Sequence, residues 1–264
     1  MKIGILSDGK PGHLNQSIGV ASILSEDLEF SFTIIHLSMK YSSLQALSRI
    51  YQRFLCRNFN KINAVKIINL FHPIYVDDFD LLIATGGNTA YISASLGKKN
   101  NIKVIQIGTV KGIDLKNYSA HITIEAKDKS PNNIVTTLAP TRYSPIETIN
   151  REKQNKALFL IGGDGSGYKY NLDDWSELVR NIKKLKDESN VSPIIVTSRR
   201  TSKAHEEFLY EQTLTFSSPA SIWFHKDGIN ADLSALFNQV DSIFVTEESS
   251  TMITEAISSG LPVC

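Results

Sequence analysis

The sequence predicts an α/β protein made of two doubly wound domains, each with a parallel sheet covered by helices on both faces. Short runs of Ile, Val and Leu, typical of fully buried strands, alternate with longer stretches of helical periodicity. This alternation occurs twice, on either side of a polar segment, 140–155, that contains two prolines. A chain of 264 residues has room for two domains of ordinary size.

Each domain is expected to contain strands that lead into helices. The predicted strands are Lys2–Leu6, Ser31–Leu37, Asp80–Ala84 and Lys103–Ile107, followed by Ala157–Ile161, Pro193–Thr197, Ser221–His225 and Ser242–Thr246. The predicted helices are Asn15–Ser25, Ser42–Asn58 and Asn88–Lys99, followed by Leu172–Glu188, Ser202–Glu211, Leu233–Asn238 and Ser249–Ser259. We expect domains at 1–145 and 156–264. The last five residues resemble a helix stop followed by the start of a buried strand, so we expect a truncated C-terminal domain.

The composition narrows the class of protein. Apolar residues make up 42% of the chain and charged residues 21%, as in soluble globular proteins rather than disordered ones. The only cysteines, Cys56 and Cys264, do not form a disulfide framework, and they indicate a reducing compartment. No apolar run approaches the ~18 residues of a membrane span, and Asp8 interrupts the apolar start too early for a signal peptide. We therefore expect a cytoplasmic protein.

The charge is unevenly distributed along the chain. Residues 1–150 hold 16 Lys and Arg against 11 Asp and Glu, a balance of +5, whereas residues 151–264 hold 12 against 16, a balance of −4. This asymmetry indicates two domains with different partners. The net charge of +1 argues against a nucleic-acid-binding protein, which is usually basic overall.

Two loops of the first domain are candidates for a cleft, because ligands of parallel sheets bind beyond the carboxyl ends of the strands. The first loop begins a helix at which His13 could act as a general base, with Asp8 as the other candidate base. The predicted cleft residues are Lys10, Gly12, Asn15 and Gln16 in this loop and Gly86, Gly87 and Asn88 in the second. The alternatives are a plain turn, with His13 as a solvent-facing cap, and an ordinary strand-to-helix turn at Gly86.

Loops of the second domain are candidates for binding a diphosphate. The glycine-rich loop 162–168 resembles a phosphate cradle but matches neither the Walker nor the dinucleotide fingerprint. Two arginines at a strand end can clamp a diphosphate, and small hydroxyl residues at a helix start offer an anion site. The predicted donor-binding residues are Gly162, Gly163, Ser198, Arg199, Arg200, Ser249, Ser250, Thr251 and Glu255. The alternative is a helix cap with a solvated Glu255.

A basic stripe marks the first domain. Arg49, Arg53, Arg57 and Lys61 recur at intervals of four, so they are expected to share one helix face, and no Asp or Glu occurs from residue 30 to residue 76. Such a face can lie on an anionic membrane surface. The alternative is the solvated face of a helix that packs on the core.

Four stretches of this sequence together resemble the mitochondrial fission ELM family and its bacterial homologues. They are Ser7–Gln16, Ile161–Gly163, Thr197–Thr201 and Val245–Val263, of which the Ser-Arg-Arg-Thr element at 198–201 is the most specific. The resemblance implies two facing Rossmann-like domains of the GT-B glycosyltransferase architecture. Plant members are implicated in mitochondrial division through recruitment of a dynamin-related GTPase, and bacterial members are labelled nucleoside-diphosphate-sugar epimerases.

Two further resemblances suggest roles for individual residues. The Ser249-Ser250-Thr251 run with Glu255 is similar to the Ser-Gly-Gly…Glu element of sugar-nucleotide 2-epimerases, in which the small residues hold the diphosphate and the acid holds the ribose. The Gly12-His13 pair is similar to the Gly-Gly-His turn of lipid-linked sugar transferases, in which the histidine faces the cleft.

These features predict a metal-independent glycosyltransferase. It would move a sugar from a nucleoside-diphosphate sugar in the second domain to a cell-envelope saccharide or lipid-linked acceptor in the first. Arg199 and Arg200 would neutralise the leaving diphosphate. The nucleoside-diphosphate sugar would be the substrate, and neither a metal nor another cofactor is predicted. The alternatives are a non-catalytic membrane-associated adaptor of the ELM type and a sugar-nucleotide epimerase. We expect a cytoplasmic protein that can lie peripherally on the inner face of the membrane.

Overall fold

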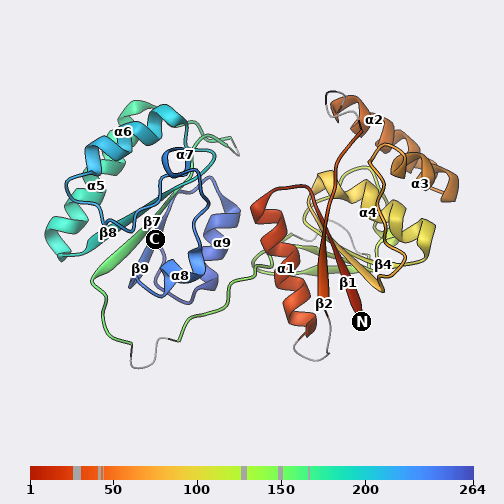
Figure 1. The fold of residues 1–264 in the computed structure, drawn as a ribbon, viewed down its shortest axis with the longest axis horizontal. Helices are drawn as coiled ribbons and strands as arrows, with labels where there is room; N and C mark the ends of the chain where they lie inside the picture. Colours follow the sequence, from red (N-terminus) through yellow and green to blue (C-terminus); the bar gives the residue numbers. More distant parts are fainter. Residues whose placement is uncertain (26–30, 41–42, 44, 126–129, 148–150, 166) are drawn as a thin grey trace. The chain divides into compact units, whose positions relative to one another are not determined.

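The chain folds into two compact units, Met1–Arg142 and Tyr143–Cys264, which we call unit 1 and unit 2. The structure is a computed structural model, drawn in Figure 1. It describes residues 1–25, 31–40, 43, 45–125, 130–147, 151–165 and 167–264.

Unit 1 is built on a parallel sheet with the strand order β2-β1-β3-β4-β5-β6. The strands are β1 (Lys2–Ser7), β2 (Ser31–His36), β3 (Leu81–Thr85), β4 (Lys103–Ile107), β5 (Ala120–Thr123) and β6 (Asn133–Val135). The strand order reverses direction between β1 and β3, because β2 lies on one side of β1 and the later strands lie on the other. This reversal is the switch point at which doubly wound sheets bind their ligands.

Helices cover both faces of this sheet (Figure 1). They are α1 (Pro11–Ser25), α2 (Gln45–Leu55), α3 (Lys61–Ile68) and α4 (Gly87–Asn100), with short 3-10 turns η2 (Cys56–Asn58) and η3 (Leu115–Asn117). Because successive strand residues point to opposite faces, Ile3 and Ile5 pack with Val20 of α1, whereas Leu6 packs with Ile92 of α4.

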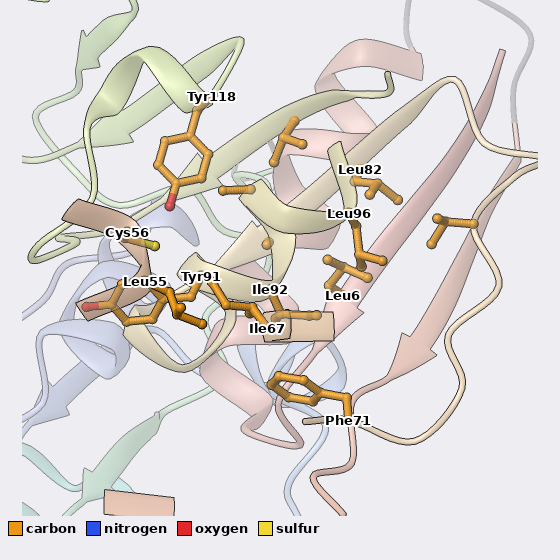
Figure 2. Close-up of a cluster of buried hydrophobic side chains, with 14 of the residues drawn as sticks. Leu6, Leu55, Cys56, Ile67, Phe71, Leu82, Tyr91, Ile92, Leu96 and Tyr118 are labelled. Atoms are coloured by element: carbon orange, nitrogen blue, oxygen red, sulfur yellow. The ribbon is translucent and has the colours of Figure 1, made fainter. Parts of the chain in front are cut away.

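The helices α2 and α3 form an outer layer, in which α3 packs on α4 and α2 packs on α3. Figure 2 shows Leu55 and Cys56 close to Tyr91 of α4, with Ile67 of α3 close to Ile92 in the same cluster. Burial raises the pKa of the Cys56 thiol to about 11, so this cysteine is a packing residue rather than a reactive one. The outer layer is therefore anchored along one side and leaves the rest of α2 exposed.

Unit 2 has the parallel strand order β8-β7-β9. Its elements are β7 (Lys156–Ile161), α5 (Leu172–Ser189), β8 (Ser192–Thr197), α6 (Lys203–Thr213), α7 (Phe224–Asp227), α8 (Leu233–Phe237), β9 (Ser242–Val245) and α9 (Ser250–Ser258). Single parallel bridges extend the sheet on both sides, Ile222 beside Val196 and Val263 beside Ile243. One face packs on α5 and α6, and the other packs on α8 and α9.

The α/β class and both parallel sheets confirm the predicted fold. The strand expected at Ser221–His225 is wrong, because only Ile222 pairs with β8 and the chain then turns into α7. Side chains cap this short helix: Thr197 Oγ1 accepts from the Phe224 N–H, and the Glu206 carboxylate accepts from the N–H groups of the next two residues.

The helix expected at Ser42–Asn58 is shorter than predicted. Its predicted start at Ser42 lies outside the described residues, and α2 ends at Leu55. The Asn63 side chain donates hydrogen bonds to the carbonyls of Leu55 and Asn58 and so satisfies the end of this segment. Asn60 then caps the separate helix α3. The strands β5 and β6 and the helix α3 were not predicted.

No helix in the described ranges combines the length and the apolar character that crossing a membrane requires.

The capping box of α5 gives a prediction about the stability of unit 2. The Asn171 side chain accepts from the N–H groups of Asp173 and Asp174, and the Asp174 carboxylate accepts from the Asn171 N–H in return. We expect Asn171→Ala to lower the free energy of unfolding by about 1 kcal/mol, measured by urea titration. Asn181→Ala, at an exposed position of the same helix, is the matched control and is expected to be neutral or slightly stabilising. Equal effects of the two variants would contradict this role of Asn171.

Candidate functional site

The Asp8 carboxylate is the centre of a hydrogen-bonded cluster at the carboxyl end of β1. Its two oxygens lie 3.0 and 3.1 Å from His13 Nδ1, in the first turn of α1. Asn88 Nδ2, in the first turn of α4, donates to Oδ2 at 2.8 Å. The Lys10 N–H donates to Oδ1 at 3.3 Å, and the Lys10 ammonium lies 3.7 Å from Oδ2. Residues 80 positions apart in the sequence thus meet at one carboxylate.

The cluster keeps Asp8 ionised. Burial alone would raise the pKa of Asp8, but the hydrogen bond and charge of His13, the Asn88 amide and the Lys10 ammonium lower it to about 2. An ionised carboxylate only accepts hydrogen bonds, so Nδ1 of His13 carries a hydrogen whether or not the ring is charged, and Nε2 has a lone pair whenever the ring is neutral. A histidine held in this way is arranged to accept a proton at Nε2.

The turn between β3 and α4 leaves room for the imidazole. Gly86 has φ +84°, and a Cβ at this position would lie 2.4 Å from His13 Cε1. Its carbonyl accepts from Nε2 of the fully buried Gln106 at 3.1 Å. A positive φ and a ring against the Cα both require glycine here. Gly86 is among the predicted cleft residues, but Gln106 is not, because the sequence of a strand does not show where a polar side chain within it points.

The other predicted cleft residues of unit 1 occupy the same two turns. Gly12, Asn15 and Gln16 are half-buried in the first half of α1. Gly87 is exposed at the first position of α4.

The structure divides the predicted basic stripe. Arg49 and Arg53 lie on α2, Arg57 lies in η2 and Lys61 begins α3, so the four cations do not share one continuous helix. The break follows from the capping of the segment by Asn63. The Arg49 guanidinium donates to Asn88 Oδ1, which connects it to the Asp8 cluster.

Unit 2 contains a buried carboxylate that sequence analysis missed. Glu248, which follows β9, is 2% exposed, and its two oxygens accept from the Gly163 N–H and the Tyr170 hydroxyl, both at 3.1 Å. A Cβ on Gly162 would lie 1.5 Å from Glu248 Oε1. Burial, then the Glu248 charge, raises the pKa of Tyr170, so its hydroxyl remains a donor. The pair 247–248 is visible in the sequence, but nothing there shows which glutamate turns inward.

Arg200 lies beside the start of α9. Its guanidinium donates to Ser249 Oγ at 3.0 Å and approaches the Glu248 carbonyl at 3.5 Å. Ser249 is buried and is the N-cap of α9, since its hydroxyl also accepts from the Met252 N–H. The sequence-predicted arginine and serine are therefore brought together at a helix N-terminus, where positive charge and unpaired N–H groups favour an anion.

The remaining predicted donor residues lie around this pair. The Ser198 hydroxyl accepts from the Arg200 N–H at 3.2 Å, whereas Arg199 is exposed. Ser250 and Thr251 form the first turn of α9, and Glu255 is 6% exposed in its second turn. Glu255 is therefore not the solvated residue of the alternative interpretation. Ser166, in the middle of the glycine-rich loop, lies outside the described residues.

Among the described residues, no group of three or more His, Cys, Asp or Glu side chains is placed to hold a metal ion.

Solved structures with the GT-B fold are similar to this chain over its whole length. A UDP-GlcNAc 2-epimerase from Methanocaldococcus jannaschii has a TM-score of 0.53 at 13% identity and covers 100% of this chain and 83% of its own. The E. coli heptosyltransferase WaaC with ADP has a TM-score of 0.50 at 10% identity, covering 100% and 86%. Phytolacca americana UGT2, complexed with UDP-2fluoro-glucose and pterostilbene, has a TM-score of 0.50 at 10% identity, covering 99% and 79%.

These similarities establish a GT-B-like protein with Rossmann-like units. Within this class, the chain belongs to the mitochondrial fission ELM1 family, whose model matches residues 11–264. This confirms the family that the sequence resembles. The search of curated proteins found no match.

The Asp8 cluster gives a prediction about the pH dependence of stability. The pKa of Asp8 falls from 3.8 to about 2 on folding. The ionised form therefore stabilises the fold above about pH 4, by roughly 2 kcal/mol, and this stabilisation disappears as the pH falls through 2. We expect Asp8→Asn to be less stable than the unmodified chain by that amount at pH 5.5. The difference should shrink steadily towards pH 2.5 in denaturant titrations.

The matched control for this experiment is Asp187→Asn. Asp187 also accepts a hydrogen bond from a lysine, Lys183, but on the exposed surface of α5. Exposed ion pairs of this kind contribute little to stability, so we expect no measurable change at either pH. A stability difference for Asp8→Asn that stays constant from pH 5.5 to 2.5 would show that the charge of Asp8 is not what stabilises the cluster.

Proposed function

We propose that the chain is a glycosyltransferase in which unit 2 binds a nucleoside-diphosphate sugar and unit 1 activates the hydroxyl of a saccharide or lipid-linked acceptor. The observation that carries this proposal is the contact of Arg200 with Ser249, the N-cap of α9. A guanidinium, a hydroxyl and a helix N-terminus together favour a diphosphate. The GT-B-like fold supports the same assignment, since two structures of this fold contain ADP or a UDP-sugar.

The diphosphate is assigned to the start of α9 rather than to the glycine-rich loop. The Gly162 N–H already donates to Thr246 Oγ1, and the Gly163 N–H donates to the Glu248 carboxylate. These amides are not available to a phosphate, and the Glu248 charge would repel one. Arg199, Ser250 and Thr251 would provide further donors, and Glu255 would accept from the ribose hydroxyls.

In the proposed reaction, the acceptor oxygen forms a bond to the anomeric carbon while the bond from that carbon to the β-phosphate oxygen breaks. The acceptor proton moves to Nε2 of His13, and Asp8 stabilises the imidazolium that results. The nucleoside diphosphate leaves with its added negative charge, which Arg200 and the α9 N-terminus would stabilise. The atoms and charges balance without another reactant.

Two other functions remain alternative proposals. An epimerase would turn over the nucleotide sugar without an acceptor, and one structure of similar fold is a UDP-GlcNAc 2-epimerase. A membrane-associated adaptor is favoured by the exposed surface of α2 and α3, where Leu47, Ile50, Phe54 and Ile62 are each more than 60% exposed next to several cations. Each cation near an anionic bilayer contributes about 1 kcal/mol of attraction. This surface would place the protein peripherally on the cytoplasmic face of a membrane.

Nucleotide binding tests the donor site. We expect at least one of UDP, GDP, CDP, ADP and dTDP to bind in calorimetry, and Arg200→Ala to weaken that binding by about 1.5–3 kcal/mol, the value of a charge-assisted hydrogen bond. Arg180→Ala, at an exposed position on α5, is the matched control and should bind as the unmodified chain does. Absence of binding by every nucleotide, or unchanged binding by Arg200→Ala, would contradict the donor site.

Turnover tests the role of His13. Release of nucleoside diphosphate from the matching sugar nucleotide, with a membrane lipid extract as acceptor, should fall roughly 10²–10⁴-fold in His13→Ala. Nucleotide affinity should not change, because the donor contacts belong to unit 2. His72→Ala, at an exposed position of unit 1, should retain full turnover. Equal turnover of the two variants would remove His13 from the mechanism. Conversion of the sugar nucleotide into its epimer without an acceptor would favour the epimerase.

A further inference from the structure

A pocket of about 370 Å³ lies in unit 1 beside the Asp8 cluster. One wall is the side of α2 that carries Arg49, Ile50 and Arg53, and another is the start of α4, from Gly87 to Tyr91. The loop after β4 contributes Thr109 and Lys111. We call this the α2 pocket. Its walls come from three separate segments, so the sequence alone does not predict it.

The lining of the α2 pocket is cationic. Three of its described lining residues, Arg49, Arg53 and Lys111, carry positive charge, and none is acidic. The pocket also lies at the N-terminus of α4, a 14-residue helix whose N-cap Gly86 has no side chain to satisfy the first N–H groups. The combination of two guanidiniums, an ammonium and a helix N-terminus favours a phosphate group.

Contacts fix the segments on both sides of the α2 pocket. The Arg53 side chain lies against Gly112, where a Cβ would be 2.7 Å from its Cγ and Nε atoms. The Tyr91 hydroxyl donates to the Lys111 carbonyl at 2.6 Å and so ties the loop after β4 to α4. Arg49 donates to Asn88, whose amide donates to Asp8. An anion in this pocket would therefore lie one hydrogen-bonded residue away from the proposed base.

The wall formed by α2 continues into an exposed apolar ridge. Leu47, Ile50 and Phe54 are 63%, 67% and 64% exposed, and their spacing places them on one side of the helix. Ile50 belongs to both the ridge and the pocket. Apolar side chains beside a cationic pocket match a ligand that has a phosphate at one end and a hydrocarbon chain at the other.

We infer that the α2 pocket binds the phosphate that joins a hydrocarbon chain to a saccharide acceptor, and that the chain lies along the ridge formed by Leu47, Ile50 and Phe54. This inference rests on the proposed function, because it names the class of acceptor whose saccharide hydroxyl the Asp8–His13 pair would activate. It differs from general attraction of a basic stripe to a bilayer, because Arg53 and Lys111 line the pocket and Arg57 and Lys61 do not.

The inference can be tested by titrating the full chain with octyl phosphate and with inorganic phosphate. Binding is followed through the amide NMR signals of Gly87, Asn88 and Lys111. Both probes should shift these signals, and octyl phosphate should bind at least tenfold more tightly because its chain buries apolar surface on the ridge. Arg53→Gln combined with Lys111→Gln should weaken both probes about tenfold or more.

Two control variants separate the pocket from its surroundings. Arg57→Gln with Lys61→Gln has the same change in charge outside the pocket and should bind both probes as the unmodified chain does. Ile50→Ser with Phe54→Ser should lose the advantage of octyl phosphate and leave inorganic phosphate unaffected. If octyl phosphate binds no more tightly than inorganic phosphate, the lipid acceptor is overturned in favour of a soluble phosphate.

Equal weakening by the two pairs of cation variants would overturn the pocket in favour of a diffuse basic surface. The donor site is monitored separately through the amide signal of Ser249 during a nucleotide titration. If no nucleotide shifts the Ser249 signal but the phosphates still shift the Gly87 signal, the glycosyltransferase is contradicted and the phosphate site remains. If a nucleotide shifts the Ser249 signal but neither phosphate shifts the Gly87 signal, only this inference is contradicted.

Discussion

A parallel sheet requires every strand to end at the same edge and every following loop to turn there into a covering element. In both units the sheet faces are filled by apolar side chains from the helices on either side. The loops at this edge are left to carry polar and charged groups. Asp8 follows β1, Gly86 follows β3, and Lys111 lies in the loop after β4; in unit 2 Arg200 follows β8 and Glu248 follows β9. Both polar clusters are consequences of this one constraint.

Each cluster then contains a buried carboxylate, and such a group is costly unless it is paired. The two units meet this requirement differently. Asp8 is stabilised by His13, an amide and an ammonium, which leaves a histidine ready to accept a proton. Glu248 accepts from a backbone N–H and the Tyr170 hydroxyl. The glycines nearby provide space: Gly86 admits an imidazole and Gly162 admits a carboxylate. A glycine-rich loop at a strand end is thus not by itself a phosphate site.

The sequence is sufficient to predict what depends on local pattern. Runs of Ile, Val and Leu identify the central strands, and polar residues after them identify the loops that carry both clusters. Features that depend on distant contacts are not predictable in this way. The helix α7 replaces an expected strand because Thr197 and Glu206 cap its N–H groups. The end of α2 depends on Asn63, which belongs to the next helix. Which of the two glutamates turns inward also depends on distant contacts, so sequence periodicity cannot show that Glu248 is buried and Glu247 exposed.

The basic stripe shows how neighbouring segments change the meaning of a charge pattern. A spacing of four residues determines the side of a helix on which Arg49 and Arg53 lie, but not what faces that side. Here the start of α4 and Lys111 face it, so these arginines line a pocket with a third cation. Charges that converge in a pocket act on a ligand at short range, where ions screen them less than on an open surface. Such convergence brings positive charges close together, and water, a neighbouring group or a bound anion compensates for their repulsion. Asn88 accepts from Arg49 and compensates for part of this charge. The part that remains, beside an exposed apolar ridge, is what an amphiphilic phosphate would neutralise.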